Sequence, residues 1–234
     1  MYVFLSDVHI RTETSYRAQL FMKFLREKRE DISGLFILGD LFEFWFEYNI
    51  VFPKDYFKTL ALLYSYIEHG VEVHYILGNH EVMIGKFLRN FGFTVHDKQA
   101  TISLFNKKVL LAHGHMLDRR LWTTFWQKLL TSRTNHALYS LLHPDLGVFL
   151  AQGIAYLSRR QRRSPQAITL LEQYARDQLR EFDIVVLAQS QIPVLKHFGN
   201  GKYYVNTGDW LDHYSYAILD ADGPRLMYYR KTAG

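Results

Sequence analysis

The chain has no cysteine among its 234 residues. That absence excludes disulfide bonds, zinc sites built on thiolates and cysteine nucleophiles, and it fits a reducing compartment. No apolar run comes near the roughly 20 residues that a membrane-spanning helix needs, and no basic start followed by a long apolar stretch indicates a signal peptide. With 48% hydrophobic and 22% charged residues, we expect a cytoplasmic, folded protein whose single domain covers residues 1–234.

Acidic residues are scarce in one part of the chain. The formal net charge is +5, yet residues 118–163 contain eight basic residues and two acidic ones, which gives this segment +6 and leaves −1 for the rest. Such a patch indicates an anionic partner: phosphate, nucleic acid or an anionic membrane surface. A solvated helix face is the other explanation. The basic residues are Arg119, Arg120, Lys128, Arg133, Arg159, Arg160, Arg162 and Arg163.

Short apolar runs alternate with segments of helical spacing, which predicts an α/β fold. About fifty residues after His115 have helical spacing and few strand signals, so we expect a helical insertion over about 116–165 rather than a separate domain. The predicted helices are 17–28, 54–68, 82–90 and 165–180. The predicted strands are 1–5, 34–38, 71–77, 93–95, 107–112, 184–187, 202–205, 214–219 and 226–229.

Metal-ligand residue types follow four of the predicted strands. These segments are Asp7-Val8-His9, Gly39-Asp40, Gly78-Asn79-His80-Glu81 and His113-Gly114-His115. Each piece alone is common, but four in order at strand ends are specific. Ligands of open α/β sheets bind beyond the carboxyl ends of the strands, so we expect the four loops to meet. Mixed oxygen and imidazole donors suit hard or borderline divalent cations.

These motifs resemble the calcineurin-like metallophosphoesterase superfamily, whose pattern is D-x-H, G-D-x-x-[DE], G-N-H-[DE], a histidine loop and G-H-x-H. The resemblance narrows to the UDP-2,3-diacylglucosamine diphosphatase family of lipid A biosynthesis. It rests on the runs Leu5–Ile10, Gly39–Trp45, Met83–Gly85 and Tyr204–Trp210. The resemblance implies a β-sandwich flanked by helices, with a helical lid at the insertion. It also implies hydrolysis of UDP-2,3-diacylglucosamine to UMP and 2,3-diacylglucosamine 1-phosphate. Peripheral attachment to the inner membrane face is a further hypothesis.

The same resemblance implies two divalent metal ions, Mn²⁺ or alternatively Mg²⁺. Asp7, His9 and Asp40 would hold the first ion, and Asp40, Asn79 and His113 the second, with Asp40 bridging. Two adjacent cations can clamp a phosphoryl group and lower the pKa of a bridging water. His80 would act as general acid or charge stabiliser, so His80, Asn79 and Asp40 are the expected catalytic residues.

The last motif departs from the family pattern. Where G-H-x-H is expected, after the strand at 184–187, the chain reads Ala188-Gln189-Ser190-Gln191. Gln189 would join the second metal and Gln191 the first, each as a neutral and weaker donor than imidazole. Three explanations stay open: a degenerate site that binds without catalysis, a natural variant that still holds metal, and introduced changes that silence the enzyme.

The insertion has the composition of a substrate lid. Its aromatic and aliphatic residues suit acyl chains, and Arg159, Arg160 and Arg163 suit a diphosphate or an anionic membrane surface. Core packing is the alternative role for the apolar residues. His115 is a further candidate for substrate contact. A different phosphodiesterase, such as a nuclease or nucleotide phosphatase, and a non-catalytic lipid- or nucleotide-binding relative remain alternatives, although the bulky apolar insertion argues against nucleic acid.

Overall fold

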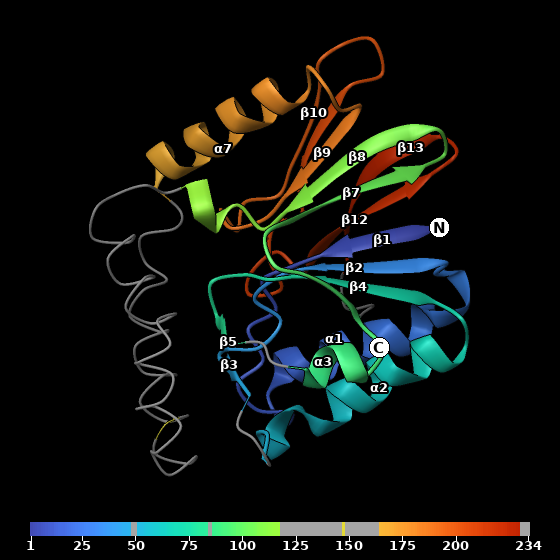
Figure 1. Cartoon of the computed structure of the whole chain (residues 1–234), viewed down its shortest axis with the longest axis vertical. Coiled ribbons are helices and arrows are strands. Elements are labelled where there is room, and N and C mark those ends of the chain that lie inside the picture. The colour runs from blue at the N-terminus through green and yellow to red at the C-terminus, as the bar shows by residue number, and fades with distance from the viewer. Residues whose placement is uncertain (48–50, 84–85, 118–146, 148–163, 230–234) are drawn as a thin grey trace.

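The computed structural model describes residues 1–47, 51–83, 86–117, 147 and 164–229. Two β-sheets lie face to face, and helices cover the outer face of each (Figure 1). A further two-stranded sheet joins β3 (Trp45–Phe46) to β5 (Glu81–Met83). This arrangement confirms the predicted β-sandwich flanked by helices.

The first large sheet has six strands, in the order β13-β12-β1-β2-β4-β6. β1, β2, β4 and β6 run parallel, β12 pairs antiparallel with β1, and β13 pairs antiparallel with β12. The parallel strands place their carboxyl ends at one edge, which is where the candidate ligands follow. The strands are β1 (Tyr2–Leu5), β2 (Gly34–Leu38), β4 (Glu72–Ile76), β6 (Thr94–His96), β12 (Ser215–Asp220) and β13 (Gly223–Tyr228).

The second large sheet has five strands, in the order β10-β11-β9-β8-β7. Its central strands β8, β9 and β11 are parallel, and its two edge strands are antiparallel to their neighbours. The strands are β7 (Gln99–Leu104), β8 (Lys107–Ala112), β9 (Ile184–Leu187), β10 (Val194–His197) and β11 (Tyr203–Asn206).

Helices α1, α2 and α3 lie on the outer face of the six-stranded sheet and α7 lies on that of the five-stranded sheet (Figure 1). The Ser15 hydroxyl accepts a hydrogen bond from the Ala18 amide at the start of α1, and Ser164 does the same for α7, where Pro165 is the first helical residue. Both are favourable helix starts. The helices are α1 (Tyr16–Lys28), α2 (Phe57–Glu68), α3 (Phe87–Asn90) and α7 (Pro165–Gln178), and the short 3₁₀ helices are η1 (Arg29–Asp31), η2 (Lys54–Tyr56) and η3 (His115–Leu117).

The central strands are buried on both faces. In β1, Val3 and Leu5 pack against α1 and α2, while Phe4 between them packs into the space between the two sheets. Because successive side chains of a strand point to opposite faces, one apolar run feeds two cores. A third core lies between the five-stranded sheet and α7, and includes Leu171 and Val185.

Most predicted elements are present with shifted ends, but one prediction is wrong. Residues 82–90 were expected to form a helix, whereas Glu81–Met83 is strand β5 and only Phe87–Asn90 is helical. The strand forms because it pairs with β3, a partner distant in sequence. β3, β7 and β10 were not predicted. No helix of the described ranges is both long and apolar enough to cross a membrane.

Candidate metal centre

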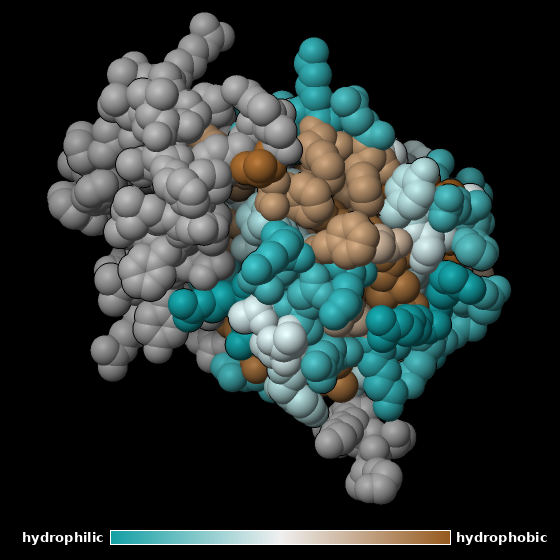
Figure 2. Space-filling model, turned by 90° about the horizontal axis from the view of Figure 1, so that it is seen from below, coloured by the Kyte–Doolittle hydropathy of each residue, from teal (hydrophilic) through white to brown (hydrophobic). Residues whose placement is uncertain are grey.

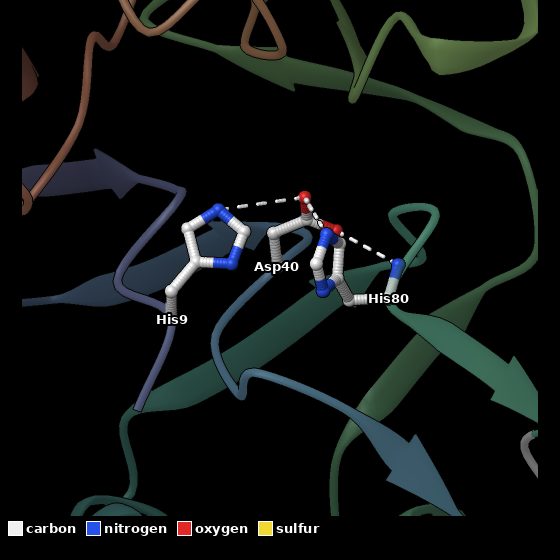
Figure 3. A group of neighbouring side chains, drawn as sticks. All are labelled: His9, Asp40 and His80. Atoms are coloured by element: carbon white, nitrogen blue, oxygen red, sulfur yellow. Dashed lines mark hydrogen bonds and ion pairs between the residues drawn. The ribbon is translucent and has the colours of Figure 1, made fainter. Parts of the chain in front are cut away.

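The predicted ligands lie in loops at the carboxyl ends of β1, β2, β4, β8 and β9. Asp40, after β2, occupies the middle of the group. Its Oδ2 lies 3.7 Å from His9 Nε2, 3.7 Å from His80 Nε2 and 3.6 Å from His113 Nε2. Figure 3 shows the imidazoles of His9 and His80 on either side of the Asp40 carboxylate. The structure thus brings together segments that the sequence predicted to meet.

The distances around Asp40 fit a cation better than direct hydrogen bonds. Separations of 3.6–3.7 Å exceed the usual hydrogen-bond range. Two atoms that each bind one cation at about 2.1 Å lie roughly 3.0–3.7 Å apart, depending on the angle. The ligand atoms of His9, Asp40 and His80 lie within 4.8 Å of one another, and so do those of the second group, Asp7, Asp40 and His113.

Burial makes this group of charges costly without a counter-ion. Asp7 and Asp40 have no exposed surface, and neither has His113. Burial would raise the pKa of Asp7, but the hydrogen bond with His9 and the charge of His113 outweigh it, so that the pKa lies below its usual value. Burial lowers the pKa of His113, yet the Asp40 and Asp7 carboxylates raise it more. Two buried carboxylates therefore attract positive charge, which a divalent cation would supply.

The backbone is left-handed at five of the predicted ligand positions. The φ angles are 53° at Asp7, 50° at His9, 54° at Asp40, 68° at Gln189 and 57° at Gln191. Such angles cost non-glycine residues of order 1–3 kcal/mol each and cluster at functional sites. The two glutamines share the conformation of the ligands, which supports their alignment with the missing histidines.

Two glycines allow the loops to approach one another. A Cβ on Gly39 would lie 2.6 Å from the Gly78 backbone and 2.8 Å from His113 Nδ1. A Cβ on Gly78 would lie 2.8 Å from the Asp40 nitrogen and 2.9 Å from Glu81 Oε2. These contacts are closer than carbon atoms tolerate, so both positions need a residue without a Cβ.

Several buried atoms of the centre have lone pairs and no hydrogen-bond donor within the described part of the chain. They are His113 Nε2, Asn79 Oδ1 and Gln189 Oε1. His113 Nδ1 lies 2.6 Å from the Leu38 carbonyl oxygen, so in the neutral imidazole Nδ1 carries the donated proton and Nε2 keeps its lone pair. That tautomer is the one a metal ligand needs. The donors around Asp40, Asn79 and His113 therefore fit a divalent cation.

Gln191 is engaged differently. Its amide nitrogen donates a hydrogen bond to Asp7 Oδ1 at 3.2 Å and lies 3.3 Å from His9 Nε2. An amide N–H group cannot act as a metal ligand in this orientation. As placed, Gln191 does not fit the predicted ligand role, because the metal would need the amide oxygen on that side.

A network of buried side chains that sequence reasoning missed supports Asp7. Ser6 Oγ donates to Asp7 Oδ2 at 2.8 Å and lies 2.7 Å from Thr207 Oγ1. The Trp210 amide donates to the Asp7 carbonyl at 3.2 Å. Asn206 donates to the Ala188 carbonyl at 2.7 Å, next to the glutamine loop. These contacts come from the run Tyr204–Trp210, which resembles the family, and they join the two ligand loops.

Glu81 supports Asp40 in the same way. Its Oε2 accepts hydrogen bonds from the Asp40 amide at 3.0 Å and the Gly78 amide at 2.8 Å. Its Oε1 accepts from the Tyr75 hydroxyl at 2.8 Å. The acidic position in G-N-H-[DE] was the available signal, but only the structure shows that it clips the β2 and β4 loops together.

The remaining predicted residues are the candidates for substrate contact. His115 lies beside His113, with ring centroids 5.4 Å apart, so a place near the centre is consistent with the substrate role predicted for it. Arg159, Arg160 and Arg163, and nearly all of the predicted lid at 116–165, lie outside the described residues. Their roles stay predictions.

Comparison with known proteins agrees with this geometry. The model of the calcineurin-like phosphoesterase family matches residues 2–146. The chain is 27% identical over 218 residues to a UDP-2,3-diacylglucosamine hydrolase of Porphyromonas gingivalis. The aligned region covers 84% of this chain and 83% of that protein. A hydrolase of the same name from Vibrio vulnificus is 33% identical over 121 residues, about half of each chain (49% and 47%).

Among solved structures, Vps29 of Chaetomium thermophilum has the same fold. Its TM-score is 0.50 at 14% identity, with 99% of this chain and 92% of that chain covered. At that identity the likeness concerns the fold alone. The family match spans most of the chain and includes four of the five ligand loops, and the chain therefore belongs to the calcineurin-like phosphoesterase family.

Proposed function

We propose that this chain is a metal-dependent hydrolase of the UDP-2,3-diacylglucosamine type, which forms UMP and 2,3-diacylglucosamine 1-phosphate. The observation that carries the proposal is the buried ligand group around Asp40. The relatives named UDP-2,3-diacylglucosamine hydrolase supply the substrate class. A diphosphate ester suits a centre in which carboxylates and imidazoles together hold cations.

The proposed ligands follow from the predicted motifs and their placement. Asp7, His9 and Asp40 form one subsite, and Asp40, Asn79 and His113 form the other. Mn²⁺ or Mg²⁺ suits these oxygen and imidazole donors. When bound, such a cation polarises a phosphoryl oxygen and lowers the pKa of a coordinated water.

His80 is the proposed acid or charge stabiliser. Its Nδ1 lies 2.5 Å from the Glu43 carbonyl oxygen, which must accept a hydrogen bond from it. Nε2 is thereby turned to the Asp40 side of the ring, at 3.7 Å from Oδ2. A proton on Nε2 could be donated to a phosphate oxygen or to the leaving oxygen there.

Apolar surface supports a lipid substrate and contact with a membrane. Val51, Phe52 and Phe57 are 46%, 37% and 60% exposed, and the Phe52 ring stacks on Phe87 at 5.3 Å between centroids. Figure 2 shows apolar side chains gathered on the face seen from below. Exposed apolar areas of this kind mark lipid or protein contacts. We propose a peripheral place at the cytoplasmic side of the inner membrane, with an anionic surface as partner.

The glutamines favour a second candidate function, a relative that binds the lipid nucleotide with little or no turnover. Gln191 holds Asp7 by a hydrogen bond, and neither glutamine supplies the imidazole of the family pattern. Another phosphodiesterase activity on the same scaffold is a further alternative, although no feature of the described residues favours it over the first.

The test is UMP release from UDP-2,3-diacylglucosamine in detergent with added Mn²⁺. The chain is compared with its Gln189→His, Gln191→His double variant, and Asp40→Asn in that variant is the inactive control. We expect the double variant to be faster by at least tenfold. If the double variant binds the lipid nucleotide and releases no UMP, the hydrolase proposal is wrong. Turnover of a simple phosphodiester but not of the lipid nucleotide would support the other phosphodiesterase.

A further inference from the structure

The two glutamines present opposite ends of the amide group to the centre. Gln189 Oε1 is buried and accepts no hydrogen bond from any described residue. Gln191 instead uses its nitrogen, which contacts Asp7 Oδ1 at 3.2 Å and His9 Nε2 at 3.3 Å. The two subsites, which sequence reasoning treated alike, therefore differ in their donors.

At the Asp7–His9 subsite the amide does what a cation would do. Gln191 Nε2 carries partial positive charge and two protons, so it donates to the Asp7 carboxylate oxygen from a position beside His9 Nε2. Gln191 is 2% exposed and both partners are buried, which strengthens these interactions. If the amide were turned over, Oε1 would face Asp7 Oδ1, and two oxygen atoms repel unless a cation lies between them.

The other subsite differs in its hydrogen bonding. His113 Nε2, Asn79 Oδ1 and Gln189 Oε1 are buried acceptors that receive no hydrogen bond from the described residues. The Asp40 carboxylate adds charge 3.6 Å from His113 Nε2. Buried acceptors without donors are costly, and a divalent cation held by them would remove that cost.

We propose that this chain holds one divalent cation, in the Asp40–Asn79–His113–Gln189 subsite, and that the Gln191 amide takes the place of the other cation. The inference rests on the metal dependence in the proposed function, but not on its substrate. A cation entering the Asp7–His9 subsite must first turn the amide and break its hydrogen bond to Asp7. A hydrogen bond to a charged group is worth enough to weaken that second binding by roughly 10- to 100-fold.

The test counts Mn²⁺ ions and measures whether they interact. Equilibrium dialysis gives the number bound per chain, and electron paramagnetic resonance detects the spin coupling of two adjacent ions. We expect one uncoupled Mn²⁺ in this chain and in Gln189→His. Gln191→His should bind two coupled ions, with the second bound about 10- to 100-fold more tightly than in the parent chain. No ion or a coupled pair in the parent, or a single ion in Gln191→His, overturns the proposal.

A matched pair of variants assigns the subsite. His9→Ala should keep the bound Mn²⁺, whereas Asn79→Ala and, as a second variant, His113→Ala should lose it. Circular dichroism checks that each variant folds. The reverse pattern, or loss in all three, contradicts the proposal. Because no substrate is present, a failure of the hydrolase assay leaves these results standing, and the two ideas can fail separately.

Discussion

Replacing Glu81 should destabilise the protein far beyond the loss of one side chain. The carboxylate is 6% exposed and accepts three hydrogen bonds, from the Asp40 and Gly78 amides and the Tyr75 hydroxyl, at 3.0, 2.8 and 2.8 Å. Glu81→Ala leaves all three donors buried and without an acceptor. At about 1–3 kcal/mol for each, the unfolding free energy should fall by roughly 3–9 kcal/mol.

Urea unfolding at pH 7 measures this effect. Glu81→Gln keeps an oxygen for the two amides and an NH₂ group that can donate to the Tyr75 hydroxyl, so it should lose less than about 1.5 kcal/mol. Glu30→Ala is the surface control, since its side chain is 86% exposed and changes of that kind stay within about 0.5 kcal/mol. If Glu81→Ala lost no more than Glu30→Ala, the idea that Glu81 clips the two loops together would be refuted.

Three further predictions concern the same region. Gly78→Ala should weaken Mn²⁺ binding at least tenfold by isothermal titration, because the added Cβ would lie 2.8 Å from the Asp40 nitrogen. The control Gly70→Ala should leave that affinity unchanged, since its Cβ would meet nothing within 4 Å. Equal effects of the two substitutions would contradict the steric argument. Trp210→Ala should lower the unfolding free energy in urea by roughly 3–5 kcal/mol, since the buried indole packs on Phe21 at 5.2 Å between ring centroids. A loss under about 1 kcal/mol would contradict this core role of the indole. Burial, and next the Asp40 charge, raise the pKa of Glu81 from 4.5 to about 7, so the metal-free chain should lose stability as the pH rises from about 4.5 to 7. In thermal melts, the slope of melting temperature against pH should be flatter for Glu81→Gln. An unchanged slope would assign the pH dependence to other groups.

Local patterns determined the fold class and the place of the centre. A short apolar run followed by Asp7-Val8-His9 or by Gly39-Asp40 identifies a strand end with potential ligands, because both signals lie within a few residues. The alternation of such runs with helical spacing also indicated the layered α/β architecture. The sequence of Ala188–Gln191 alone revealed that two imidazoles are missing.

Contacts between residues distant in the sequence could not be predicted from local patterns. The helix expected at 82–90 is partly strand β5, because Glu81–Met83 pairs with Trp45–Phe46, and periodicity over a short apolar run cannot detect such a partner. Likewise Val3 and Phe4 read as one apolar run, yet they belong to two different cores. Which face of a doubly buried strand meets which layer depends on the packing of the whole chain.

The chemistry of the centre also depends partly on the local sequence and partly on contacts between distant residues. The sequence by itself determined which residue types stand at the ends of the strands, because those positions follow from local order along the chain. Only the tertiary structure decided that Ser6 and Thr207, 201 positions apart, together support Asp7, and that the Gln191 amide points its nitrogen at Asp7. Hydrogen bonds depend on distance and orientation between atoms, and folding alone brings such remote groups within reach of one another.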